Sequence, residues 1–250
     1  MPRLTVVAVA FVVLGSLLPP HQASGYEVVS VANGGTIEGK VVFTGAPPAP
    51  RKVIPTKDKE VCGGVRDVPQ ILLAPDKGVQ DAFVYLKAVE KGKGWEKTPK
   101  TPAIDNEKCD FHPHVQIMPA GDVEIVNSDP VLHNTHGFLG KQTVFNQAMP
   151  TKGMHIEKPI RKPGMMRIEC DVHGWMLGWV YAAEHPYYAV TKKDGTFSIP
   201  DVPPGSYTLV AWQEATDPAE VPVTVKAKEA AQQTIELKNA TELNLEQKKK

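Results

Sequence analysis

Residues 165–183 read MMRIECDVHGWMLGWVYAA and contain two strand-like runs joined by the loop CDVHGWM at 170–176. We expect the two runs to pair as antiparallel strands, with the loop as the hairpin that links them. A hairpin of this length can turn the side chains of Cys170, His173 and Met176 toward one point. The sequence therefore predicts a β protein in which one loop brings together a thiol, an imidazole and a thioether.

The rest of the chain has the same β character. Its 23 prolines and 20 glycines separate short runs that are rich in Val, Ile, Tyr and Phe. This spacing of strands and turns is typical of an all-β, sandwich-like protein. The predicted strands are 36–43, 82–88, 114–118, 122–127, 153–158, 165–170, 177–183, 196–199, 206–212, 221–226 and 233–237, with a hairpin tip at 193–195 and at most one short helical turn at 214–220.

The charge pattern argues against a polyanion as partner. Lys and Arg total 28 residues, as do Asp and Glu, and the only basic run is the terminal Lys248–Lys250. Nucleic acid is therefore not expected to bind.

The N-terminus has the pattern of a targeting segment. Arg3 precedes an apolar run from Leu4 to Leu18, and Ala23-Ser24-Gly25 offers small residues for cleavage before Tyr26. We therefore predict a signal peptide at 1–25 and a periplasmic or extracellular protein without a membrane span in its mature form. An uncleaved anchor is the alternative.

Three cysteines, Cys62, Cys109 and Cys170, follow the predicted signal peptide. In an oxidising compartment an odd number leaves at least one thiol unpaired or bound to metal. A disulfide between Cys62 and Cys109 is possible, and Cys170 would then be the unpaired thiol.

The chemistry of the loop points to copper. A thiolate, an imidazole and a soft thioether suit an ion that alternates between Cu(I) and Cu(II). A trigonal site needs a second imidazole from another strand end, and the segment VEIVNSDPVLHNTHGF (123–138) offers His133 or His136.

The C-x-x-H-x-x-M spacing and the upstream His-Asn pair resemble the cupredoxins, the blue-copper proteins, and amicyanin-like sequences among them. The resemblance implies one type 1 copper ion held by His133, Cys170, His173 and, as a weak axial ligand, Met176. It also implies that Asn134 bonds across to the cysteine loop and steadies it.

Gly174 departs from this pattern, because amicyanin-like sequences carry proline there. That substitution makes the loop less stiff. We also expect an apolar rim around an exposed edge of His173, which would suit a redox protein partner.

A second resemblance covers the flanking sequence. GGTIEGKVVFTG (34–45) and DGTFSIPDVPPGSYTL (194–209) resemble the carboxypeptidase regulatory-like domain, a Greek-key sandwich of transthyretin type. The predicted organisation is nested: this sandwich is formed by 34–98 and 188–238, the copper domain is inserted at 99–187, and a polar tail occupies 239–250. Two domains in tandem, the first incomplete, are the alternative.

The motifs of familiar enzymes are missing. The sequence has no H-C-H strand for a trinuclear copper cluster, no H-E-x-x-H and no G-x-S-x-G. His112 and His114 could contribute to a second metal site, although surface histidines beside a disulfide are the simpler reading. The sequence thus predicts a non-enzymatic carrier of single electrons, with copper delivery or sensing, or a non-redox envelope scaffold, as alternatives. It names neither the redox partner nor the oligomeric state.

Overall fold

The computed structural model describes residues 25–96 and 101–239 of the chain. Apart from Gly25 and Asn239, the predicted signal peptide (1–25) and polar tail (239–250) lie outside the described residues. The predicted domain boundary at 98/99 also lies outside them.

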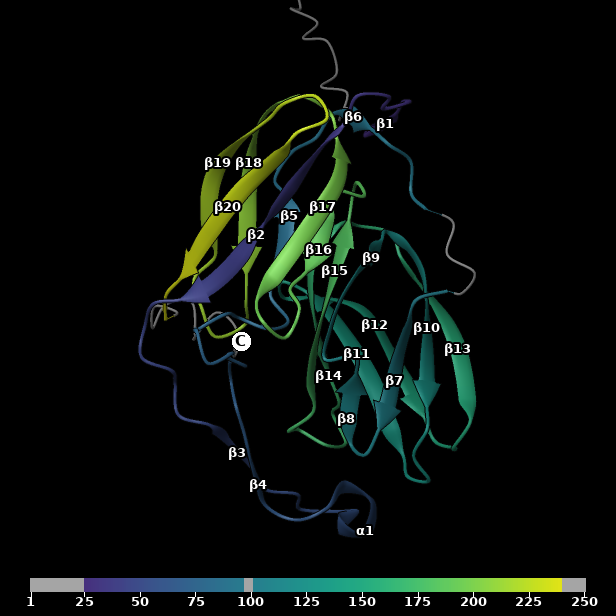
Figure 1. Ribbon diagram of the computed structural model, residues 1–250. Coiled ribbons are helices and arrows are strands. Elements are labelled where there is room, and N and C mark those ends of the chain that lie inside the picture. Colours follow the sequence, from purple (N-terminus) through teal and green to yellow (C-terminus); the bar gives the residue numbers. More distant parts are fainter. Residues whose placement is uncertain (1–24, 97–100, 240–250) are drawn as a thin grey trace, which may run out of the picture.

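The chain forms two β-sandwiches, so the prediction of an all-β fold is confirmed (Figure 1). The first sandwich, at the upper left of the figure, has one sheet in the order β16-β5-β18-β19 and a second in the order β17-β2-β20. Segments far apart in the sequence pair directly here, because β2 lies between β17 and β20. The strands are β2 (Gly35–Phe43), β5 (Phe83–Leu86), β16 (Tyr188–Val190), β17 (Thr196–Val202), β18 (Gly205–Trp212), β19 (Ala219–Val225) and β20 (Ala230–Leu237).

The second sandwich is formed by the intervening residues and has sheets in the orders β13-β10-β7-β8 and β12-β11-β14-β15-β9. Both sheets are mixed, since β7 runs parallel to β10 and β9 runs parallel to β15. The strands are β7 (Ala103–Glu107), β8 (Asp110–His112), β9 (Val115–Pro119), β10 (Gly121–Asn127), β11 (His133–Leu139), β12 (Gln142–Met149), β13 (Met154–Ile160), β14 (Gly164–Glu169) and β15 (Leu177–Ala183).

Residues 44–82, which we call the covering segment, connect β2 to β5. The segment leaves the first sandwich, passes beneath the second and returns, as the lower part of Figure 1 shows. It contains β3 (Arg51–Val53), α1 (Lys59–Cys62) and β4 (Arg66–Val68), and β3 pairs with β4. A further small pair joins β1 (Glu27–Val28) to β6 (Lys91–Gly92).

Alternation along β2 explains why one face of this strand packs against the core. Ile37, Val41 and Phe43 are buried, whereas Glu38 is exposed. Side chains two residues apart point to the same face of a strand, so these apolar residues face the core together. Burial of this apolar face against the opposite sheet stabilises the first sandwich.

The two sandwiches meet through aromatic side chains. Trp179 of β15 lies 5.0 Å from Trp212 of β18, and Trp212 stacks on Phe83 of β5 at 5.3 Å between ring centroids. These three residues form a shared apolar cluster, which fixes β15 against the first sandwich.

The predicted helical turn at 214–220 is wrong. In the described ranges the only α-helix is the four-residue α1, and none is long and apolar enough to cross a membrane. Gln213 explains the difference, because its side-chain oxygen accepts a bond from the N–H of Ala215 and its carbonyl accepts one from the hydroxyl of Thr216. These local bonds replace the helical pattern.

The predicted hairpin tip at 193–195 is a tight turn, closed by the bond from the N–H of Gly195 to the carbonyl of Lys192. The strands on either side belong to different sheets, however, since β16 pairs with β5 and β17 pairs with β2. The turn therefore links the two sheets of the first sandwich and does not close a hairpin.

Replacing Ile37 by alanine tests the importance of β2. Ile37 is fully buried, so we expect Ile37→Ala to lower the free energy of unfolding by about 2–5 kcal/mol in urea denaturation. Val65→Ala, at a 62% exposed position of the covering segment, is the control and should change little. Similar losses for both variants would contradict the assignment of β2 to the core.

Candidate metal centre

Three potential ligand residues come from two neighbouring strands and the loop between β14 and β15. His133 begins β11, and Cys170 directly follows β14. β11 pairs with β14 through His136 and Glu169, which brings the two strand ends together. His173 lies in the loop after Cys170, where its N–H donates to the cysteine sulfur at 3.3 Å.

The ligand atoms converge. The Nδ1 atoms of His133 and His173 lie 3.0 Å apart, and the sulfur of Cys170 lies 3.9 Å from the first and 3.8 Å from the second. All three side chains are buried in the second sandwich. The structure thus brings together three of the residues that the sequence singled out.

Both imidazoles are oriented by carboxylates on the opposite side of the ring. Nε2 of His133 lies 2.9 Å from Oδ2 of Asp129, and Nε2 of His173 lies 2.9 Å from Oδ2 of Asp58. A carboxylate oxygen accepts a hydrogen bond from an N–H group. In a neutral ring bonded to a carboxylate through Nε2, the hydrogen is therefore on Nε2. The Nδ1 lone pairs are then directed toward the same point as the cysteine sulfur.

The distances fit a metal ion. The point equidistant from the two Nδ1 atoms and the sulfur lies about 2.1 Å from each, and zinc–imidazole and zinc–thiolate bonds are roughly 2.0–2.3 Å long. The two Nδ1 lone pairs and the thiol sulfur are buried and face one another. A cation bound between them would be coordinated by all three atoms.

Burial shifts the two titrating groups in opposite directions. Burial lowers the pKa of His133, although the hydrogen bond that its ring donates to Asp129 opposes the shift, and burial raises the pKa of the Cys170 thiol. A neutral imidazole is ready to bind a cation. The thiol must lose its proton on binding, so metal binding at this site is coupled to proton release.

Met176 lies at the end of the same loop. It is buried in the core cluster that also contains Cys170, and its N–H donates to the carbonyl of His173 at 2.9 Å. This bond closes the turn that leads into β15.

Asn134 bonds across to the cysteine loop. Its Oδ1 accepts from the N–H groups of Asp171 at 2.7 Å and of Val172 at 3.2 Å. Its Nδ2 donates to the carboxylate of Asp171 at 2.8 Å and to Oδ1 of Asn146 at 2.8 Å. One side chain therefore holds the loop against both β11 and β12.

His136 is directed away from the other ligand residues. Its Nδ1 lies 3.1 Å from Asp171, its Nε2 lies 3.0 Å from Thr143, and its ring packs on Phe138. Between the two upstream histidines that the sequence offered, the structure places His133 at the centre.

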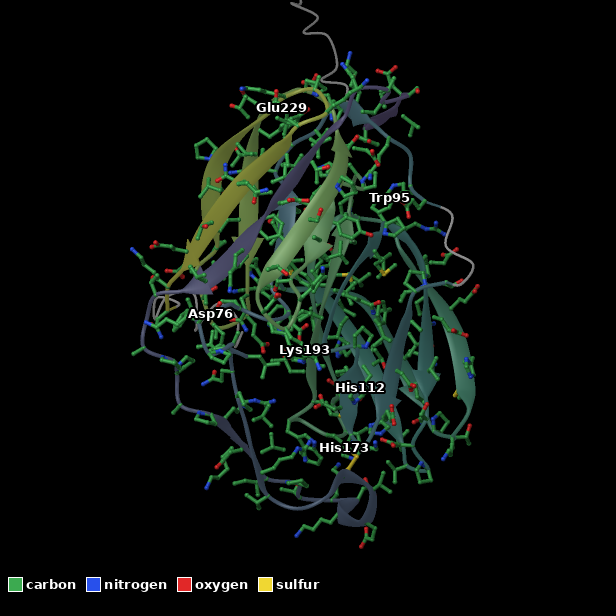
Figure 2. All side chains as sticks on the ribbon, in the orientation of Figure 1. Asp76, Trp95, His112, His173, Lys193 and Glu229 are labelled. Carbon is green, nitrogen blue, oxygen red and sulfur yellow. A yellow bond between two sulfur atoms is a disulfide. The ribbon has the colours of Figure 1, made fainter. Side chains whose placement is uncertain are left out.

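The expected exposed edge of His173 is absent. The side chain is fully buried, because Asp58 of the covering segment bonds its outer nitrogen. Figure 2 shows His173 beside the disulfide and directly above α1. This disulfide joins Cys62 of α1 to Cys109 and leaves Cys170 as the free thiol. The prediction of an apolar docking rim at His173 is therefore wrong.

Within the part of the chain that the structure describes, neither His112 nor His114 belongs to a cluster of three potential ligand residues. Nε2 of His114 lies 2.9 Å from the carboxylate of Glu214, which also accepts from the indole N–H of Trp179 at 2.5 Å.

This His114–Glu214 pair borders a cavity of about 390 Å³ between the covering segment and both sandwiches. Most of the lining is apolar, with Phe111, Leu177 and Trp179 from the second sandwich. The pair thus provides a polar link between the sandwiches at the edge of an apolar cavity.

Two residues that orient the imidazoles, Asp129 and Asp58, were not predicted from the sequence. Asp129 lies four residues before His133, in the turn S-D-P, so its proximity could have been recognised. Asp58 is 115 residues away from His173 and belongs to the covering segment, and no local pattern indicates its role.

Residues 180–238 match the family model of the carboxypeptidase regulatory-like domain, which confirms that resemblance. A curated relative, described as probable rhamnogalacturonate lyase A of Aspergillus flavus, is 40% identical over 53 residues, or 21% of this chain. The matched region spans only 10% of that relative.

Solved structures similar to the chain are cupredoxins and a related enzyme. A purple cupredoxin from Nitrosopumilus maritimus is 22% identical and covers 33% of this chain and 99% of its own, with a TM-score of 0.29. Amicyanin from Paracoccus versutus is 20% identical, with coverages of 40% and 97% and a TM-score of 0.31. A copper-containing nitrite reductase from Thermus scotoductus is 24% identical, with coverages of 39% and 25% and a TM-score of 0.30.

Asn134→Ala tests the support of the loop. The N–H groups of Asp171 and Val172 would lose their shared acceptor, so we expect a loss of about 1–3 kcal/mol in the free energy of unfolding and faster amide exchange at both residues. Gln142→Ala, at an exposed position of β12, is the control. Unchanged exchange at 171 and 172 would show that other contacts hold the loop.

The His114–Glu214 pair predicts a pH effect. Burial alone would lower the pKa of His114, but the bond and charge of Glu214 outweigh it, so the pKa is raised in the folded protein. The stabilisation is complete below the unfolded value of about 6.5 and is lost as pH rises through the folded pKa. The destabilisation caused by His114→Gln should therefore shrink from pH 6 to pH 9 in urea denaturation. In a Glu214→Gln background the same replacement should lose this pH dependence, and its persistence there would refute the pairing.

Proposed function

We propose that this protein is an exported type 1 copper protein that carries single electrons. The observation that carries the proposal is the convergence of two Nδ1 lone pairs and one cysteine sulfur at a buried point. Two imidazoles and a thiolate with a weak thioether are the ligand set of blue-copper electron-transfer sites. A copper ion held there would supply a one-electron couple between Cu(I) and Cu(II).

In this proposal His133, Cys170 and His173 would hold the copper ion, and Met176 would supply the weak thioether ligand. Burial of Met176 in the same core cluster as Cys170 supports its role. The carboxylates of Asp129 and Asp58 accept from Nε2 of the two rings, which fixes the ring orientations and leaves Nδ1 as the lone-pair nitrogen of each neutral imidazole. Asn134 fixes the cysteine loop by accepting a hydrogen bond from the N–H of Asp171.

Rigid ligand residues favour electron transfer over delivery of the metal. A delivery site has to present its ligand atoms to an acceptor protein, whereas all three residues here are buried and held by further hydrogen bonds. A site of this kind changes little between oxidation states, and its residues need little rearrangement when an electron arrives. Copper delivery or sensing is therefore the weaker candidate.

In the same proposal the protein has no catalytic role, and its partner is a redox protein. The lack of oxidase motifs in the sequence supports the absence of a catalytic role. Because Asp58 covers His173, the partner would dock elsewhere on the second sandwich. The disulfide between Cys62 and Cys109 supports export, since such bonds persist in oxidising compartments.

The visible spectrum of the purified protein with added Cu(II) tests this function. We expect a strong thiolate-to-copper charge-transfer band that is lost in Cys170→Ser and strongly weakened in His133→Gln. His136→Gln is the matched control, because His136 lies in the same strand but is directed away from the centre, and it should keep the band. A colourless wild-type protein, or a band that depends on His136, would refute the proposed site.

A further inference from the structure

The disulfide lies close to both histidines of the candidate metal centre. Sulfur atoms of Cys62 and Cys109 lie within 4.8 Å of a ring nitrogen of His173, and Cys109 is within the same distance of Asp129 and His133. Each half of the disulfide is connected to one histidine through one carboxylate.

The first connection runs through α1. The carbonyl of Asp58 accepts the N–H groups of Val61 at 3.0 Å and of Cys62 at 2.8 Å, so the position of Asp58 depends on that of Cys62. The side chain of Asp58 then bonds Nε2 of His173 at 2.9 Å. Its backbone has a φ of 51°, in the left-handed region, so the chain around it is held in place by its surroundings.

The second connection runs through the turn between β7 and β8. Lys108 and Cys109 form its two central residues, with φ values of 54° and 56°, a conformation that normally favours asparagine and glycine. Asp129 holds this turn, because its two carboxylate oxygens accept the N–H groups of Lys108 and Cys109, each at 2.8 Å. The oxygen bonded to Cys109 also bonds Nε2 of His133.

Near His173 the covering segment also packs Val61 against the core cluster of the second sandwich and forms hydrogen bonds through two arginines. Arg51 donates to the carbonyl of Trp175 at 2.9 Å, and Arg66 donates to the carbonyl of Cys62 within the segment itself. The helix α1 is only four residues long and lacks a side-chain cap at its N-terminus. The disulfide is therefore the covalent anchor that keeps Asp58 over the metal centre.

We propose that the Cys62–Cys109 disulfide is a thiol-sensitive lock on the metal centre, with Asp58 and Asp129 as the positioning residues through which it acts. This inference rests on the proposed function, because it concerns the same metal site. With the disulfide intact, both imidazoles are held and His173 is covered. With the disulfide reduced, Asp58 can withdraw, His173 becomes accessible and the ion exchanges.

The opening step requires a dithiol reductant. A thiolate of the reductant attacks the sulfur of Cys62, the sulfur of Cys109 leaves and takes up a proton, and a mixed disulfide with Cys62 forms. The second thiol of the reductant then displaces Cys62 as a thiol, so the reductant becomes a disulfide and the protein gains two electrons and two protons. Cys62 lines a surface hollow together with Arg66, Lys108 and Asp110, and we take this hollow as the route by which the thiolate approaches.

Transfer of Zn(II) from the loaded protein to a chromogenic chelator tests the lock, because zinc does not change oxidation state. The protein is reduced with dithiothreitol, separated from the reagent under argon and then loaded. A thiol assay after denaturation should count one thiol before reduction and all three cysteines after it. We expect zinc transfer to be about 10- to 100-fold faster after reduction, and equally fast in the Cys62→Ser/Cys109→Ser variant.

Asp58→Ala keeps the disulfide and alters a side chain that is 35% exposed, so it tests the connection without removing the covalent anchor. It should also transfer zinc faster, and it should shift the charge-transfer band of the Cu(II) form, which a purely structural role would not do. Asp58→Asn retains an acceptor oxygen and should restore most of the slow transfer. Asp67→Ala, at an exposed position of the same segment, is the matched control.

Three results would overturn the lock. The first is a disulfide that dithiothreitol does not reduce in the folded protein. The second is equal zinc transfer from the oxidised and reduced forms, with unchanged circular dichroism. The third is wild-type behaviour of Asp58→Ala. In each case a persistent charge-transfer band would leave the proposed copper function intact. Loss of the band from the oxidised wild-type protein would instead refute the function itself.

Discussion

The structure of the metal centre depends on two hydrogen bonds, those from Nε2 of His133 to Asp129 and from Nε2 of His173 to Asp58. Each bond decides which ring nitrogen carries the hydrogen, and it thereby leaves the Nδ1 lone pair directed at the sulfur of Cys170. Without these bonds, two imidazoles only 3.0 Å apart would satisfy each other by rotation or tautomer change. The carboxylates convert a buried pair of rings into a set of acceptors that a cation completes.

The two carboxylates come from different parts of the fold. Asp129 belongs to the turn between β10 and β11 in the second sandwich, whereas Asp58 belongs to the covering segment that leaves and re-enters the first sandwich. The first sandwich therefore contributes to the candidate metal centre in the second one. Its strands β2 and β5 fix both ends of the covering segment, and the aromatic cluster of Trp179, Trp212 and Phe83 fixes its orientation to the second sandwich.

Local patterns made the hairpin around Cys170 and the strands of alternating apolar residues predictable. The strands β11 and β12 were missed, because polar side chains interrupt apolar alternation in HNTHGFL and QTVFNQAM. Spacing could have separated His133 from His136, since residues three apart in a strand face opposite sides. No local pattern could reveal Asp58, whose contact with His173 depends on the route of a 39-residue connection and on a disulfide.

Gly174 shows how tertiary contacts replace local stiffness. A proline at this position would restrict the loop through its ring, whereas glycine leaves the backbone free, and a Cβ placed there would meet no neighbour within 4 Å. The loop is held instead at both sides of Gly174. Asp58 bonds the ring of His173, and Arg51 bonds the carbonyl of Trp175. Both contacts come from the covering segment, so a distant segment anchored by a disulfide supplies the rigidity that the loop lacks in its own sequence.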